Sequence, residues 1–197
     1  MAHDHHHDHD HDHDHDGHDD AEGVREAEAR RAHALAQIRQ YPDVALGLTA
    51  HEVAEFDADL RRLVERMEQL MHDAQGVGLA ATQVGVLRRL FVFQTEDETV
   101  HAIVNPRIRD RSSATDLQEE GCLSLQGVRV PVERALSVTL EGKDPEGNDV
   151  RLELEGMAAR VVQHENDHLD GTLIIDRTDD EHRREALGIL RPQPVLR

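Results

Sequence analysis

Apolar residues follow a helical period in the segment 57–76, DADLRRLVERMEQLMHDAQG. Spacings of three and four residues place the following on one helical face: Leu60, Leu63, Val64, Met67, Leu70 and Met71. Asp57 or Asp59 can cap the first turn, and Gly76 follows the last one. The pattern predicts an amphipathic helix whose methionines pack in the core rather than contact a cofactor.

Three other segments have the composition of helices or the residues that commonly end them. Residues 24–40, VREAEARRAHALAQIRQ, are rich in alanine, glutamate and arginine and precede Pro42. The segment 155–172, EGMAARVVQHENDHLDGT, should end at Gly171, because glycine readily takes the left-handed backbone that follows many helices. The C-terminal stretch DDEHRREALGILRPQPVLR predicts a short helix that ends at Pro192.

The region 87–156 changes to short β-branched runs, LRRLFVFQT, VHAIVNPRI and GVRVPVERA, which are separated by turn-forming residues. Within it, SVTLEGKDPEGNDVRLELE predicts two antiparallel strands joined by a turn. The order of helix, several strands and helix predicts an α+β domain.

The chain has 197 residues, enough for one domain with a hydrophobic core plus appendages. Its first 20 residues contain nine histidines and eight aspartates. Such a segment cannot bury a core, so it is predicted to be disordered. Its imidazoles and carboxylates could chelate a divalent metal without fixed geometry, or the segment could be an expression tag or a solvated tail.

The formal net charge is −19 at pH 7, which argues against binding to nucleic-acid phosphates. No run approaches the roughly 18 apolar residues that span a membrane, and the N-terminus lacks the apolar core of a signal peptide. These features predict a soluble, cytoplasmic protein. Cys122 is the only cysteine, so it is a buried residue, a metal ligand or a nucleophile rather than half of an internal disulfide.

The motif QHENDHLDG contains two histidines four positions apart. On a helix His164 and His168 share one face, about 5–6 Å apart at Cβ, so both can reach one cation. Glu165 is offset by about 100° and can stand beside the metal without ligating it, which suits hydrolysis. Met157 and Val161 continue the same predicted inward-facing stripe. The alternatives are core histidines bonded to backbone, or a chance pattern in a charged helix.

A catalytic metal site of this type needs a third protein ligand and an open position. After His168 the chain offers only His182 and scattered carboxylates, whereas Cys122 lies upstream in EGCLS. One thiolate and two imidazoles suit zinc or ferrous iron. In the segment 76–86, GVGLAATQVGV, small residues let the backbone lie close to another group, and Gln83 could donate to a developing oxyanion. The alternative there is a tight turn packed under the sheet.

Together, GVGLAATQ, EGCLS and QHENDHLDG resemble the three signature motifs of the peptide deformylases, in order and at suitable separations, within about residues 38–177. The resemblance implies an α+β fold with small antiparallel sheets around a central HExxH helix. It implies metal-dependent removal of the formyl group from the N-formylmethionine of nascent polypeptides, which would be its partners in the bacterial cytoplasm. The family commonly works with Fe²⁺, and Zn²⁺, Ni²⁺ or Co²⁺ can occupy the site.

Carried over by position, the resemblance also assigns roles to individual residues. The metal ligands would be Cys122, His164 and His168, with Glu165 as the general acid/base. The tetrahedral oxyanion would be stabilised by Gln83 and the backbone N–H of Leu123. The imidazole of His164 would be oriented by Glu120, which pairs with Arg134. The methionine side chain and the extended peptide backbone would be bound by Val77, Gly78, Met157 and Val161.

The chain departs from the residues usual in the family at Val44, Gly47, Gln118, Gln126 and Arg160. None of these is a ligand or the general base, so they bear on substrate preference and rate rather than on chemistry. In some relatives a basic terminal helix docks on the ribosome. Acidic residues dilute the basic ones here, so the sequence supports ribosome docking only weakly.

The expected organisation is a disordered tail over 1–23, a helical extension over 24–37, a catalytic domain over 38–178 and a C-terminal helix and tail over 179–197. Two other functions compete with the deformylase. A zincin-type HExxH peptidase usually takes its third ligand downstream, so Cys122 argues against it. A metal-storage or metal-sensing protein would act through the His/Asp-rich tail, which the complete ligand set disfavours.

Overall fold

The computed structural model describes residues 16–191, with side chains from residue 22 onward. The predicted disorder of the tail therefore falls mainly on residues 1–15, outside the described part. Residues 16–23, which were also assigned to the tail, form the first turns of a helix. That part of the prediction is wrong.

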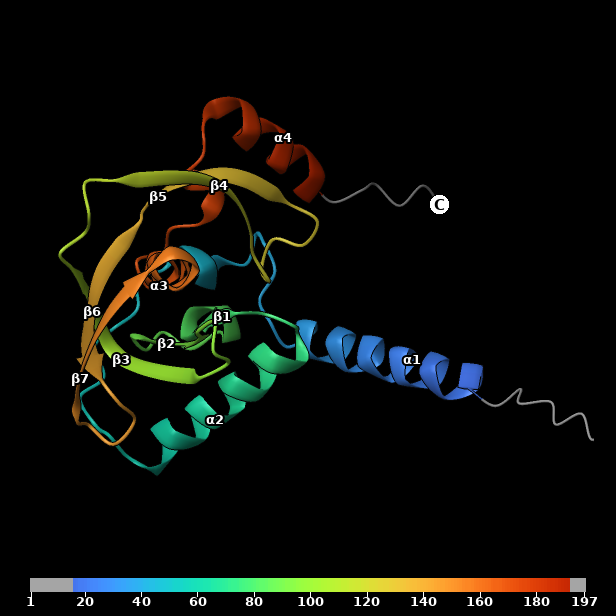
Figure 1. The fold of residues 1–197 in the computed structure, drawn as a ribbon, viewed down its shortest axis with the longest axis horizontal. Helices are drawn as coiled ribbons and strands as arrows, with labels where there is room; N and C mark the ends of the chain where they lie inside the picture. Colours follow the sequence, from blue (N-terminus) through green and yellow to red (C-terminus); the bar gives the residue numbers. More distant parts are fainter. Residues whose placement is uncertain (1–15, 192–197) are drawn as a thin grey trace, which may run out of the picture.

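The strands within residues 16–191 form two antiparallel sheets (Figure 1). The larger has the order β1-β2-β3-β6-β7: Gly78–Ala80, Leu90–Gln94, Val100–Arg109, Ser137–Lys143 and Asp149–Glu155. The smaller pairs β4, Thr115–Gly121, with β5, Arg129–Ala135. Strand β1 is an edge strand whose only partner among the described residues is β2.

The described residues also form four α-helices: α1 Asp16–Leu35, α2 Ala58–Asp73, α3 Gly156–Leu169 and α4 Asp180–Leu190. Helix α3 lies centrally and contacts strands of both sheets, whereas α2 packs on β1 and β2 and α4 packs on β5 (Figure 1). Short 3-10 turns cover Val44–Gly47, Ala81–Val84 and Ile174–Asp176. The predicted α+β class, with antiparallel sheets around the HExxH helix, is confirmed.

Helix α2 buries the face that the sequence pattern predicted, and Leu63 lies partly buried at its margin. Asp57 caps the helix, because its side chain accepts a hydrogen bond from Leu60 N at 2.8 Å. Gly76 lies beyond the end of the helix, as predicted, and Gln75 before it takes the left-handed backbone, with a φ of 58°. Gly76 is close to Leu123, where a Cβ would lie 2.7 Å from Cδ1.

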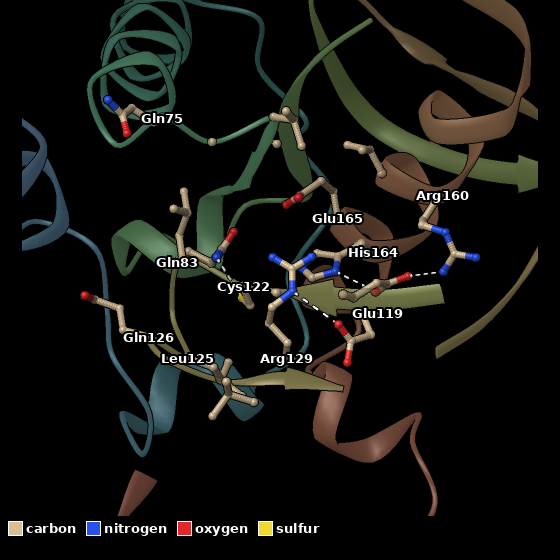
Figure 2. A pocket seen from close by; sticks show the side chains of 18 of the residues that line it. Gln75, Gln83, Glu119, Cys122, Leu125, Gln126, Arg129, Arg160, His164 and Glu165 are labelled. Atoms are coloured by element: carbon tan, nitrogen blue, oxygen red, sulfur yellow. Dashed lines mark hydrogen bonds and ion pairs between the residues drawn. The ribbon is translucent and has the colours of Figure 1, made fainter. Parts of the chain in front are cut away.

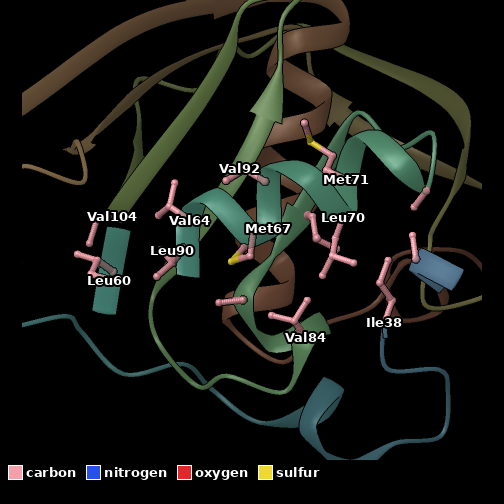
Figure 3. Packing of buried hydrophobic residues seen from close by; sticks show 14 of the residues in the cluster. Ile38, Leu60, Val64, Met67, Leu70, Met71, Val84, Leu90, Val92 and Val104 are labelled. Atoms are coloured by element: carbon pink, nitrogen blue, oxygen red, sulfur yellow. The ribbon is translucent and has the colours of Figure 1, made fainter. Parts of the chain in front are cut away.

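The buried face of α2 packs on the large sheet and on the chain that follows α1 (Figure 3). The contributing side chains include Leu60, Val64, Met67, Leu70, Met71, Val84, Leu90, Val92, Val104 and Ile38. This cluster holds β1 and the turn after it in place beside α3. The prediction that the methionines belong to the core is confirmed.

Helix α1 begins eight residues before the predicted start at Val24 and ends at Leu35, well before Pro42. Its last turn tightens through hydrogen bonds from Gln37 N to Ala34 O and from Ile38 N to Leu35 O. The helix stops there because Ile38 turns into the core, where its burial outweighs the helical propensity of the following residues.

The predicted hairpin is confirmed as β6–β7, in register with Leu140 opposite Leu152. Strands β1 and β4 were missed. The sequence of β4, TDLQEEG, is polar and mostly exposed, so no alternation reveals it, and pairing with β5 along its whole length forms the strand. Gly171 takes a φ of 70° directly after the Asp170 cap of α3, as predicted.

Candidate active site

Two of the three motifs contribute a cluster of potential metal ligands, Cys122, His164 and His168. Figure 2 shows Cys122 and His164 with Gln83 of the third motif beside them. Cys122 directly follows β4, whereas both histidines project from α3. The ligating atoms all lie within 4.8 Å of one another, and Cys122 Sγ is 3.3 Å from His168 Nε2. The fold therefore brings one sulfur and two imidazole nitrogens together, a donor set suited to zinc or ferrous iron.

Hydrogen bonding determines which ring atom of His164 faces the thiol. Its Nδ1 lies 3.0 Å from Glu120 Oε2, which leaves Nε2 for the cluster. Burial lowers the pKa of His164, but hydrogen bonds with Cys122 and Glu120 and the nearby negative charges outweigh it, so the pKa is raised well above 6.5. The same negative groups would favour a bound cation.

His168 is almost completely buried, with 1% of its surface exposed. Burial, followed by the charges of His164 and Arg134, lowers the pKa of His168 well below 6.5. The ring is therefore neutral near pH 7, which is the form that binds a metal. The residues thus fit a divalent cation in charge, donor type and separation.

Glu165 lies beside this cluster but is not part of it (Figure 2). Its carboxylate packs against the backbone of β1, where a Cβ on Gly78 would lie 2.3 Å from Glu165 Oε1. The other oxygen, Oε2, is buried and has no hydrogen-bond partner among the described residues. Burial raises the pKa of Glu165 from its ordinary 4.5 to about 7. A carboxylate in this state can both accept and return a proton near neutral pH.

Glu120 forms the centre of a buried ion-pair network that supports His164. Arg134 binds it through two hydrogen bonds of 2.9 Å, from Nε and Nη2. Arg160 Nη1 adds a contact of 2.8 Å to Oε1. Burial opposes ionisation of Glu120, but the hydrogen bonds from His164 and Arg134 and their charges outweigh burial and lower its pKa far below 4.5. The carboxylate that orients His164 therefore stays ionised.

Glu120→Gln should destabilise the metal-free protein at pH 7 and weaken the dependence of its stability on pH. The pKa of Glu120 is lowered by folding, so its ion pairs stabilise the fold above pH 4.5 and are lost as the pH falls through the folded-state pKa. The difference in unfolding free energy between wild type and variant should shrink by more than about 1.4 kcal/mol as the pH is lowered from about 6 to about 3. This energy corresponds to one pKa unit.

Urea unfolding at the two pH values measures this difference. The matched control is Glu119→Gln, since the neighbouring Glu119 is 68% exposed and pairs with Arg129 only at 3.8 Å. A stability difference that does not change with pH would show that Glu120 is not ionised in the folded protein. Metal affinity should fall about 10- to 100-fold in the Glu120 variant only.

Gln83 and Leu123, the residues assigned to the oxyanion, both line the same cavity. Gln83 is buried, accepts a hydrogen bond from Ala80 N at 2.8 Å, and directs Nε2 toward Ser124 Oγ at 3.1 Å and Cys122 Sγ at 3.7 Å. The loop carrying Leu123 is fixed by a hydrogen bond of 3.0 Å from Gln40 Nε2 to Leu123 O. Both donors are thus anchored beside the cluster.

A cavity of about 700 Å³ opens over this cluster and contains all four residues assigned to substrate binding: Val77, Gly78, Met157 and Val161. Val161 is buried, but Met157 is 49% exposed, so its assignment to an inward-facing stripe is wrong. Met157 lies in the first turn of α3, where the helix has not yet entered the core. Val77, at 55% exposure, lies similarly at the rim.

The sequence analysis did not predict that Asp167 and Arg177 belong to the charge network. Asp167 accepts hydrogen bonds from Arg134 Nη1 at 2.5 Å and from Arg177 Nη2 at 2.6 Å. No local pattern connects these three residues, which come from β5, α3 and the chain after it. Of the departures from the residues usual in the family, Gln126 and Arg160 line the cavity, whereas Gln118 is exposed and does not.

Comparison with known proteins decides the family. The family model for polypeptide deformylase matches residues 35–184, which include every residue of the site described above. The chain belongs to the polypeptide deformylase family. Peptide deformylase 1 of Corynebacterium glutamicum is 42% identical to it over 161 residues, covering 80% of this chain and 95% of the relative.

Solved structures of deformylases agree with this assignment. The peptide deformylase from Thermotoga maritima matches with a TM-score of 0.70 at 43% identity, over 72% of this chain and 96% of that one. The peptide deformylase from Legionella pneumophila gives a TM-score of 0.74 at 38% identity, covering 78% of this chain and 91% of that one. The predicted family, fold and hydrolase class are confirmed, and the peptidase and metal-storage alternatives are not favoured. Among the described residues, no helix is long and apolar enough to cross a bilayer.

Proposed function

We propose that this deformylase hydrolyses the formyl amide of N-formylmethionyl peptides at the cluster of Cys122, His164 and His168, releasing formate. The observation that carries the proposal is the position of the Glu165 carboxylate. Its carboxylate is buried within the cavity beside three convergent metal ligands, and Oε2 has no partner among the described residues. A buried carboxylate in that position has the geometry of a general base.

A bound divalent cation supplies Lewis acidity at this position, which lowers the pKa of a water molecule and polarises a carbonyl group. Glu165 accepts the proton of the attacking water and returns it to the leaving methionine nitrogen. Gln83 Nε2 and the N–H of Leu123 donate to the oxygen that becomes negative as the carbonyl carbon is attacked. Glu120 keeps the ring of His164 oriented throughout.

The substrate backbone would bind to the free edge of β1. Val77 and Gly78 line the cavity at this edge, and an extended peptide can add to such a strand with little dependence on its sequence. Val161 and Met157, on the first turns of α3, would contact the methionine side chain. The exposure of Met157 leaves that contact partly open to solvent.

We further propose Fe²⁺ as the native metal, with Zn²⁺, Ni²⁺ or Co²⁺ able to replace it, since one thiolate and two imidazoles accept all of these ions. Nascent chains in the bacterial cytoplasm would be the partners. The proposal does not extend to ribosome docking, because α4, with the sequence DEHRREALGIL, carries three acidic residues beside its two arginines. The His/Asp-rich tail, which could chelate metal, lies mainly outside the described residues.

The test uses full-length protein purified without oxygen and analysed for bound metal. Formyl-Met-Ala-Ser amide, acetyl-Met-Ala-Ser amide and a blocked peptide with only internal amides are assayed side by side, with formate as the product. Formate release from the first peptide alone is expected. Cleavage of the internal amide without formate release would favour a peptidase instead.

A further inference from the structure

The last turn of α1 forms part of the wall of the active-site cavity. Arg31 and Leu35 both line the cavity of about 700 Å³, which is also lined by the metal ligands Cys122 and His164. Arg31 precedes the residues that match the family model, which begin at Leu35. Arg31 therefore lies outside the segment that matches the family model, whereas Leu35 lies at its first position.

A second cavity, of about 480 Å³, adjoins the first on this side. The two share Arg31, Leu35 and Gln126 as lining residues, and the second is completed by side chains of α1 and the segment after it. Gln126 lies on the side of the pocket where the blue ribbon of α1 enters the view (Figure 2). A groove thus leads from the metal cluster, past the loop after Cys122, to α1.

Charge pairing distinguishes Arg31 from the other arginines of the active-site cavity. Arg160 is paired with Glu120 at 2.8 Å and Arg129 with Glu119 at 3.8 Å. Arg31 makes no hydrogen bond or ion pair with any residue that the structure describes. Glu28, the acidic residue nearest to it along α1 in the groove, lines only the smaller cavity.

The backbone that carries Arg31 is nevertheless anchored. Ala34 is 1% exposed and Leu35 is 7% exposed, and both belong to the core cluster under α2. Arg31 lies one helical turn before Leu35, so its exposed side chain extends from an anchored backbone at the wall that the two cavities share. A guanidinium that has no partner among the described residues can bind a carboxylate through two parallel hydrogen bonds.

We propose that Arg31 is a specificity-determining residue that binds an acidic side chain downstream of the formylmethionine. The inference rests on the proposed function, because the formyl end must lie at the metal cluster for downstream residues to reach α1. A nascent chain has no free carboxyl terminus near its start, so the carboxylate must belong to Asp or Glu at the third or fourth position.

The test compares two series of amidated peptides, formyl-Met-Ala-Xaa-Ser and formyl-Met-Ala-Ser-Xaa, in which Xaa is Glu, Gln or Lys. Wild type should prefer Glu over Lys by about fivefold in kcat/KM in at least one series, the size expected for one exposed ion pair. Arg31→Glu should abolish or invert this preference, with the change in KM rather than kcat because the contact does not involve the reacting atoms. Salt at 0.5 M, an order-of-magnitude increase over low-salt buffer, should weaken the wild-type preference.

The matched control is Arg30→Glu, which makes the same charge change on the same helix. Arg30 pairs with Glu26 and lines neither cavity. The inference is overturned if Arg31→Glu shows the same Glu-to-Lys ratio as wild type and the Arg30 variant in both series. If metal-loaded wild type fails to deformylate even the neutral Gln peptides, the proposed function itself is rejected, and the inference with it.

Discussion

Replacement of Glu165 by glutamine should lower kcat/KM for a formyl-Met peptide by about 10³-fold while one divalent cation remains bound per chain. The amide has the size of the carboxylate but cannot accept the proton of the attacking water. Glu165 is not among the clustered ligands, so its loss should leave the binding atoms of Cys122, His164 and His168 unchanged. Activity and metal content are measured on the same preparation.

Glu155→Gln is the matched control, because Glu155 precedes the same helix without a capping hydrogen bond from its side chain, is exposed, and lies outside the cavity. Near-wild-type activity of the Glu165 variant would contradict the assigned proton transfer. Loss of metal together with activity would contradict a second assumption, that Glu165 is no ligand. A bound cation favours the ionised carboxylate, so the raised pKa of about 7 belongs to the metal-free protein.

Part of the site was predictable because its geometry is local. The four-residue spacing of His164 and His168 fixes their common face on any α-helix, and the offset of Glu165 follows from the same period. Cys122 is different, since its position relative to the histidines depends on the pairing of β4 with β5. The sequence indicated that Cys122 belongs with them only through the need for a third ligand and through the combination of the three motifs.

The remaining features depend on contacts between distant segments. Asp167 accepts hydrogen bonds from Arg134 of β5 and from Arg177 in the chain after α3. Neither pairing has a sequence signature. By sequence spacing, Met157 continues the apolar stripe of α3, but the first turn of the helix lies at the open side of the cavity. The place of Arg31 in the cavity wall follows from how α1 packs on α2, which helical propensity does not specify.

Replacement of Cys122 by alanine should reduce metal affinity by more than about 100-fold, beyond the loss that accompanies removal of an outer hydrogen-bond partner. Activity at a fixed, low metal concentration should fall in proportion. The thiol is the only donor that β4 and its following turn contribute to the cluster, so the two imidazoles alone would have to hold the ion. Competition with a chromogenic chelator measures the affinity.

The His/Asp-rich segment can itself bind metal without fixed geometry, so the measurement is repeated in a chain lacking residues 1–20. In that chain, metal at 100 times its Kd should stabilise wild type by about 2.7 kcal/mol, and Cys122→Ala should gain far less at the same concentration. Because the stabilisation depends on binding to the folded state, it separates the folded site from loose chelation by the tail. If metal stabilised the truncated wild type and the truncated Cys122→Ala variant equally, Cys122 would not be a ligand, and the lone cysteine would be a half-buried residue beside the cavity.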